Sequence, residues 1–186
     1  MKKEHPSIGR SVVRVQNVST PRKQAGFGAL EVMIAIIVGL FAILGAVAWY
    51  SKLSTTSNNQ TELENVSSLI TNIRTLRTSS GYGTVGSLNT VLVSTNGIPE
   101  TMRTSGSNVY NAWDGAVTAA STGAGYTLTY ASVPAAGCIF LATKSPSSSA
   151  TSLKINGGTA INGEVTQTAA AAGCSTDTNT LVWSGR

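Results

Sequence analysis

A single glutamate lies at the start of an apolar run that is long enough to cross a membrane. Glu31 is followed by Val32 to Tyr50, a stretch without any charged residue. A helix rises about 1.5 Å per residue, so residues 27–50 would extend about 36 Å, enough to span the hydrocarbon core of a bilayer. An isolated carboxylate in hydrocarbon costs about 2–3 kcal/mol on insertion scales. The pattern therefore predicts that Glu31 has a partner for its charge.

The basic charge of the chain is concentrated before this run. Residues 1–26 hold six basic residues and one acidic residue, whereas residues 27–186 hold seven of each. The formal net charge of +5 therefore belongs to the first 26 residues, and it does not indicate nucleic-acid binding. A basic segment before an apolar run holds the N-terminus in the cytoplasm. Cleavage after Gly26 would leave the apolar helix on the mature chain, the alternative being an uncleaved signal anchor.

Apolar residues at three- and four-residue spacing predict that the helix continues as an amphipathic segment. Glu62 and Glu64 are expected to face away from the apolar stripe, which consists of Leu63, Val66, Leu69, Ile70, Ile73 and Leu76. The polar stretch Ser54–Asn59 favours a bend or local fraying, and helix signals end at Ser79-Ser80-Gly81. We therefore expect four segments: a leader at 1–26, the apolar half of the helix at 27–52, its amphipathic half at 53–80 and a globular domain at 81–186.

The composition after residue 81 favours an α+β domain whose antiparallel sheet covers the amphipathic helix. Tyr126–Tyr130 alternates as a strand does, and Val117 is expected in a partner strand across the Ser121–Gly125 turn. Low complexity predicts loops at Ser145–Ser152 and Thr166–Gly173. The other expected elements are a short helix at 86–94, a short helix rather than a strand at Pro134–Lys144, and strands at Ser152–Ile155 and Thr180–Trp183.

The residues that usually carry catalysis or bind metals are sparse. His5, the only histidine, lies in the leader, so the rest of the chain offers none for a nucleophilic triad or a metal site. The acidic residues are scattered, no phosphate-binding glycine loop occurs, and a Ser/Lys pair with Lys144 or Lys154 has no supporting motif. We expect no enzymatic activity, no cofactor and no metal. Cys138 and Cys174 lie in the part expected to be exported, which predicts one disulfide rather than two buried free thiols.

Residues Tyr110–Gly115 form the densest cluster of aromatic and turn-forming residues in the predicted globular domain. One interpretation is a surface binding loop, because loops often carry recognition. We favour a structural corner in which Asn111 and Gly115 make the turn and Trp113 packs between sheet and helix. In this corner, Asp114 is expected to accept hydrogen bonds from neighbouring backbone amides.

The leader and the apolar helix resemble those of type IV prepilins. In that family a basic leader ends in glycine, cleavage precedes phenylalanine or another hydrophobic residue, and glutamate is the fifth mature residue. Gly26, Phe27 and Glu31 match all three points. The long leader and the absence of proline from the apolar run resemble the type IVb branch. The C-terminal half is similar to PilS-type major pilins of conjugative-plasmid thin pili and their enterobacterial relatives, on four features: the Asn111–Gly115 turn, Cys138 after Val-Pro, Lys154–Gly157 and the alanines before Cys174.

The resemblance implies a type IV pilin fold and the role of major subunit in a type IVb pilus. A prepilin peptidase would cut between Gly26 and Phe27. The resemblance does not decide whether the new amine is methylated. Subunits would wait in the inner membrane of a Gram-negative-type bacterium, then form an extracellular filament for adhesion or conjugative mating-pair contact. The implied partners are copies of the chain, an assembly ATPase with its inner-membrane platform, an outer-membrane secretin and a tip adhesin. The alternatives are a pseudopilin of type II secretion and a minor or tip pilin.

Overall fold

The computed structural model describes residues 28–145 and 150–186, with only the backbone described over residues 47–53. The chain divides into two units, Met1–Leu44 and Gly45–Arg186. The long helix α1, Ala29–Thr75, contributes residues to both. Its helical backbone continues through Ser54–Asn59, where a bend or fraying was expected. It ends at Thr75 with Arg74 in the last turn, where a cation suits the negative end of the helix dipole.

In the first unit, α1 is apolar and every described side chain is exposed. The window Ala29–Ala46 has a mean hydropathy of 2.5 and none of it is buried. By length and composition, this helix can cross a membrane. This exposed apolar segment confirms the prediction that the first half of the long helix is hydrophobic.

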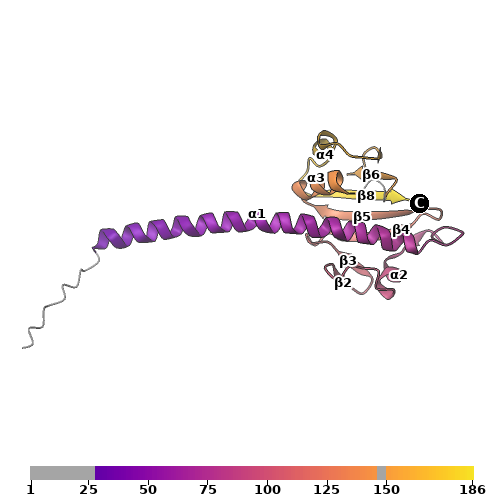
Figure 1. Ribbon diagram of the computed structural model, residues 1–186, viewed down its shortest axis with the longest axis horizontal. Helices are drawn as coiled ribbons and strands as arrows, with labels where there is room; N and C mark the ends of the chain where they lie inside the picture. Colours follow the sequence, from indigo (N-terminus) through magenta and orange to yellow (C-terminus); the bar gives the residue numbers. More distant parts are fainter. Residues whose placement is uncertain (1–27, 146–149) are drawn as a thin grey trace, which may run out of the picture. The chain divides into compact units, whose positions relative to one another are not determined.

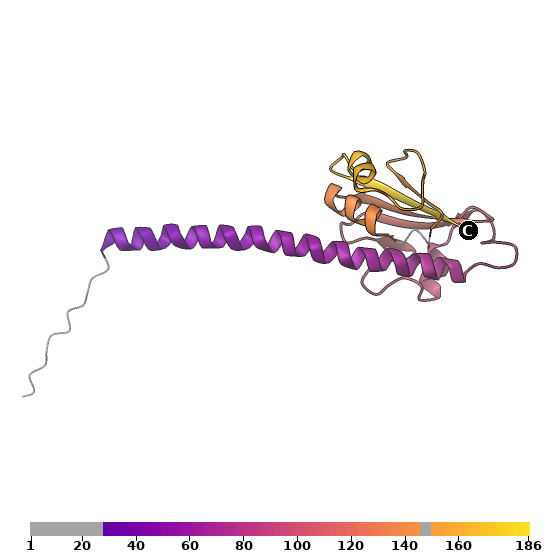
Figure 2. The same cartoon turned by 45° about the horizontal axis from the view of Figure 1, so that its top comes forward.

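The second unit is built on an eight-stranded antiparallel sheet in the order β2-β3-β4-β5-β8-β6-β7, with β1 also paired to β4. The C-terminal strand β8 lies between β5 and β6, as Figure 1 shows; Figure 2 gives the same cartoon turned by 45°. The strands are β1 (Gly86–Ser87), β2 (Arg103–Ser105), β3 (Asn108–Tyr110), β4 (Ala116–Ser121), β5 (Tyr126–Val133), β6 (Ser152–Ile155), β7 (Ile161–Asn162) and β8 (Asn179–Gly185). The predicted pairing of the Val117 strand is confirmed, with Val117 opposite Tyr130 and Ser121 opposite Tyr126.

Three shorter helices accompany the sheet: α2 (Asn89–Ser94), α3 (Ala135–Lys144) and α4 (Gln167–Gly173). The α3 helix confirms the prediction of a helix over a strand, and it begins directly after Pro134, whose fixed φ suits a helix start. The expected helix at 86–94 is shorter than predicted, because Gly86–Ser87 pairs with β4 as β1. Of the loop predicted at Ser145–Ser152, residues 146–149 lie outside the described part of the chain.

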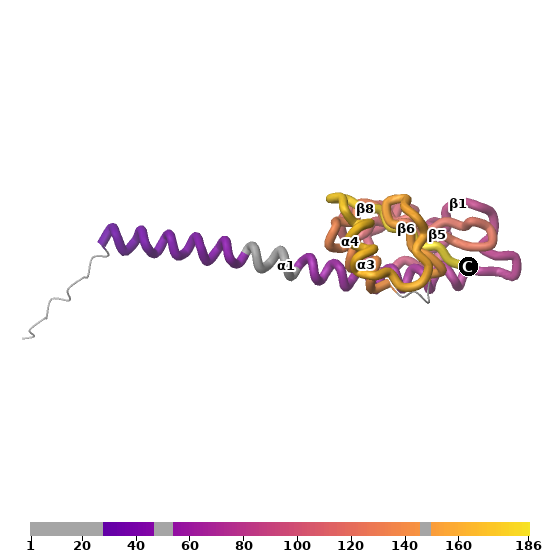
Figure 3. Tube along the Cα trace, turned by 90° about the horizontal axis from the view of Figure 1, so that it is seen from above, coloured from indigo at the N-terminus to yellow at the C-terminus, as the bar shows by residue number. Residues whose placement is uncertain are grey.

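The loop predicted at Thr166–Gly173 is wrong, because this segment forms α4. The Thr166 hydroxyl oxygen accepts a hydrogen bond from the backbone N–H of Ala169 at 3.2 Å and caps the helix. Four alanines follow, and alanine has the highest helix propensity. Figure 3 shows α4 beside α3, which it contacts. The low complexity of this segment therefore reflects a helix rather than a loop.

The core lies between the amphipathic half of α1, α3 and one face of the sheet. Along β5 and β8 the residues alternate between buried and partly exposed, as expected for a sheet covered on one face. Tyr130 and Trp183 on this face meet edge to face, with ring centroids 5.6 Å apart. The predicted stripe of α1 is confirmed, with Leu63 and Leu76 partly buried and four residues fully buried: Val66, Leu69, Ile70 and Ile73.

The expectation that Glu62 faces away from the core is wrong. Its side chain is only 1% exposed, whereas Glu64 is exposed as predicted. Glu62 precedes Val66 by four residues, so both side chains lie on the same face of α1. The four-residue spacing indicates a buried position for Glu62, whereas the charge of glutamate favours the solvent-facing position that was predicted.

Candidate functional site

Glu31 lies in the first turn of α1, at the start of the exposed apolar segment. The carbonyl oxygen of Gly28 accepts hydrogen bonds from the N–H groups of Glu31, at 2.9 Å, and Val32, at 3.2 Å. A carboxylate suits this position because the first turn is the positive end of the helix dipole. Within the described residues the only ion pair joins Arg103 and Asp114, so Glu31 has no intramolecular cation partner there.

Many large apolar side chains on either side of Glu31 are exposed. Those from Leu30 to Leu44 include Phe41, which is 70% exposed, and Met33, which is 67% exposed. Contiguous apolar surface of this extent marks a contact with lipid or with protein. The predicted cleavage residues Gly26 and Phe27 lie outside the described residues, so their arrangement relative to Glu31 stays a prediction.

The predicted disulfide between Cys138 and Cys174 is confirmed, and neither cysteine is a free thiol. Cys138 lies in α3 and Cys174 caps the C-terminus of α4, with their Cα atoms 5.8 Å apart. Both residues are buried. The bond therefore links α4 directly to the helix that packs on β8.

The turn after β3 is organised by Asn111. The side-chain oxygen of Asn111 accepts hydrogen bonds from the N–H groups of Trp113, at 3.0 Å, and Gly115, at 2.8 Å. Its amide nitrogen donates to the carbonyl oxygen of Ala131 on β5 at 2.8 Å. Trp113 is partly buried against the core and lies beside Gly137 of α3. These bonds tie the turn to the sheet.

Asp114 takes a different partner from the one expected. Its carboxylate forms an ion pair with the guanidinium of Arg103 on β2, and the guanidinium lies over the ring of Tyr110, 4.2 Å from its centroid. Both charged side chains are largely exposed, so the pair contributes little to stability. Asp114 therefore lies on the outer side of the turn.

Gly115 is the position in this turn where a side chain is excluded. A Cβ atom on Gly115 would collide with the carbonyl oxygen of Ala131. We predict that Gly115→Ala lowers the free energy of unfolding by about 3 kcal/mol, at the upper end of overpacking costs because the obstacle is backbone. Thermal unfolding of the full chain in detergent, followed by circular dichroism, measures this loss. Gly39→Ala is the matched control, because no atom lies within 4 Å of the added methyl group, and equal melting of the two variants would contradict the prediction.

The buried carboxyl of Glu62 also contacts this turn. Its Oε1 accepts a hydrogen bond from the backbone N–H of Ala112 at 2.7 Å, whereas its Oε2 has no hydrogen-bond partner. Burial raises the pKa of Glu62, and the hydrogen bond from Ala112, together with the nearby donors Asn65 and Tyr130, opposes this shift only in part. Burial and the neighbouring Glu62 also raise the pKa of Tyr130 on β5 well above its usual value.

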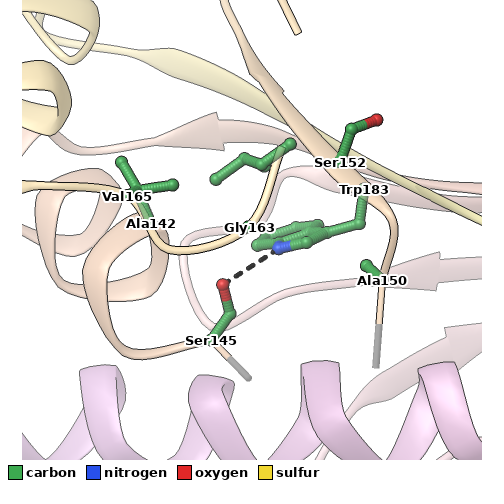
Figure 4. A pocket seen from close by; sticks show the side chains of 8 residues that line it. Ala142, Ser145, Ala150, Ser152, Gly163, Val165 and Trp183 are labelled. Atoms are coloured by element: carbon green, nitrogen blue, oxygen red, sulfur yellow. Dashed lines mark hydrogen bonds between the residues drawn. The ribbon is translucent and has the colours of Figure 1, made fainter. Parts of the chain in front are cut away.

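Two hollows of very different size lie in the described part of the molecule. A cavity of about 10 Å³ lies beside Trp183, whose indole nitrogen donates to the hydroxyl of Ser145 at 3.1 Å (Figure 4). A second, open hollow of about 340 Å³ lies between α2 and β2 and includes Met102. Over residues 28–145 and 150–186, no group of three His, Cys, Asp or Glu side chains could hold a metal ion.

An exposed apolar helix segment, an amphipathic continuation packed on an antiparallel sheet and a C-terminal disulfide are consistent with a type IV pilin-like subunit, the class that the family match supports. The chain belongs to the PilS family, because the family model described as PilS N terminal matches residues 56–186. This family is structural rather than enzymatic, and membership implies self-assembly into a pilus from a membrane-anchored precursor. The match begins after Glu31. No curated protein and no solved structure matches the chain.

Proposed function

We propose that the protein is the major structural subunit of a type IVb pilus. In this proposal it is cut between Gly26 and Phe27 and polymerised into an extracellular filament for adhesion or conjugative mating-pair contact. The observation that carries it is the exposed apolar segment of α1 with Glu31 in its first turn. Such a surface requires lipid before assembly and neighbouring helices after it, which is the environment that a polymerising subunit provides.

Cleavage after Gly26 would place a new α-amine at Phe27, one helical turn before Glu31. The carboxylate of an incoming subunit would then pair with the Phe27 amine of the subunit ahead. In an apolar filament core the effective dielectric constant is low, so the attraction between these charges is stronger than in water. Pairing also removes the cost of leaving either charge isolated. The interaction therefore favours insertion of each subunit at a defined axial position.

The other proposed partners follow from this assembly route. A prepilin peptidase would process the chain, an ATPase and an inner-membrane platform would drive its addition, and a secretin would pass the filament through the outer membrane. The basic residues 1–26 support this orientation, because positive charge holds that end in the cytoplasm. A tip adhesin would complete the filament.

N-terminal sequencing and intact mass of the material sheared from the cell surface test the proposal. The expected result is a chain that starts at Phe27 and whose mass reflects the loss of two hydrogens at the disulfide. A chain that starts at Phe27 but occurs only in the cell envelope would favour a type II secretion pseudopilin. Trace amounts beside a more abundant pilin would favour a minor or tip subunit, and any other N-terminus would overturn the processing step.

We predict that Gly26→Val abolishes cleavage, because a branched side chain at the residue before the scissile bond would prevent the backbone from approaching the peptidase closely. The precursor should then retain residues 1–26 and migrate as a larger species on a denaturing gel. Gly9→Val is the matched control, since it makes the same change elsewhere in the leader. Normal processing of Gly26→Val would contradict the proposed cleavage site.

A further inference from the structure

We propose that Glu62 is a buried proton-binding site that couples docking of the Tyr110–Gly115 turn on α1 to pH. This inference concerns the folded sheet domain, so it does not depend on the proposed cleavage or on filament assembly. It concerns Glu62, which takes no part in the proposed pairing of Glu31 with Phe27.

The geometry around Glu62 favours a neutral carboxyl group. The side chain is 1% exposed and Oε1 accepts a hydrogen bond from the Ala112 N–H. No donor lies within hydrogen-bond geometry of Oε2, and the Asn65 amide and the Tyr130 phenol, which lie near the carboxyl group, offset the cost of burial only in part. Two neighbouring buried amides on the same helix are also incompletely satisfied, at Asn59 Oδ1 and Asn65 Nδ2. A buried carboxylate normally needs several donors or a cation. A proton on Oε2 would remove the charge while Oε1 still accepts from Ala112.

No described side chain supplies a compensating positive charge. From β5 the facing titratable group is the phenol of Tyr130, and from α1 the facing group is the uncharged amide of Asn65. The turn contributes the Ala112 N–H, and its charged pair Arg103–Asp114 is exposed. The α3 helix approaches Asn59 at Gly137, and the only titratable side chain of α3 is Lys144 at its C-terminal end, because Cys138 is bonded in the disulfide.

The direction of the pH effect follows from the raised pKa of Glu62. The folded chain holds the proton more tightly than the unfolded chain, in which the pKa is about 4.5. The stability contributed by this proton is complete below the unfolded pKa and is lost as the pH rises towards the folded pKa. The ionised carboxylate then favours water over its buried site. Higher pH therefore loosens the contact between α1 and the turn.

Thermal unfolding of the full chain in detergent at pH 5 and pH 8 tests this inference. The wild type should melt at a lower temperature at pH 8 than at pH 5, because the raised pKa means that ionisation destabilises the buried carboxyl group. Glu62→Gln keeps the shape and an acceptor for Ala112 but cannot ionise, so its melting temperature should change much less with pH. Glu64→Gln, which changes an exposed carboxyl two residues away, is the matched control and should behave as the wild type does.

A Glu62→Gln variant that retains the wild-type pH dependence would overturn the inference. A second measurement on the wild type covers the case in which the variant does not fold. Carbon-13 NMR with assigned glutamate carboxyl signals should show that Glu62 titrates above the usual glutamate range. The hydrogen-exchange rate of the Ala112 amide should rise over the same pH interval. The rise should exceed the increase that base catalysis alone produces in an unprotected amide. Titration of every glutamate in the usual range would exclude the proton site.

Discussion

Replacement of Glu31 by valine is expected to reduce the yield of surface filaments about 100-fold or more, without preventing cleavage after Gly26. Breaking a buried ion pair by removing one partner costs about 3–5 kcal/mol, and about 1.4 kcal/mol corresponds to a factor of ten. In Glu31→Val the Phe27 amine of the neighbouring subunit would remain buried without its partner. Quantitative blotting of sheared filaments and of cell-associated mature chain measures both parts of the prediction.

Two further variants separate charge from shape in this experiment. Leu30→Val changes the neighbouring apolar side chain and should assemble as the wild type does. Glu31→Gln keeps the side-chain length but removes the charge, so it should assemble poorly like Glu31→Val. Wild-type filament yield from both Glu31 variants would contradict the proposed pairing with Phe27.

Removal of the disulfide is expected to cause the second large effect. Cys138 and Cys174 are 36 residues apart in the sequence, and closing a loop of this length contributes about 3–4 kcal/mol in the chain-entropy model. The double variant Cys138→Ala/Cys174→Ala should therefore melt about 10 °C lower. The loss should be largest where α4 meets α3, because the disulfide is the cross-link that joins these two helices directly. Differential scanning calorimetry of the full chain in detergent measures the change.

The reduced wild type is the matched control for this double variant. If the disulfide itself stabilises the chain, reductant should lower the melting temperature of the wild type and leave that of the double variant unchanged. Equal melting of oxidised wild type and double variant would contradict the prediction. A loss in the variant without a loss on reduction would show instead that the cysteine side chains stabilise the core through packing alone.

Local patterns in the sequence were sufficient to predict much of this fold. The stripe from Leu63 to Leu76 predicted the buried face of α1, because helix periodicity determines which side chains share a face. The alternation at Tyr126–Tyr130 predicted β5 and its pairing with the Val117 strand. These features depend on residues that are close in the sequence, so no distant contact was needed to infer them.

Other features were missed although their signals were present. Thr166 and the alanines after it form a capped helix, but their low complexity was interpreted as a loop. Glu62 lies four residues before Val66, yet its charge led to the expectation of a solvent-facing side chain. Burial of Glu62 depends on the Ala112 N–H, which lies 50 residues further along the chain. Because this contact joins segments that are distant in the sequence, local spacing did not reveal the burial of a side chain that usually faces water.

The sequence by itself determined that the chain begins with a basic segment and an apolar helix, that an α+β domain follows, and that Cys138 and Cys174 pair. Only the tertiary structure decided that β8 lies between β5 and β6, that α4 packs on α3, and that Glu62 is buried under the Tyr110–Gly115 turn. The physical reason is the range of the interactions. Hydrophobic periodicity and helix propensity act between near neighbours, whereas strand order and the burial of a carboxyl group depend on contacts between distant segments.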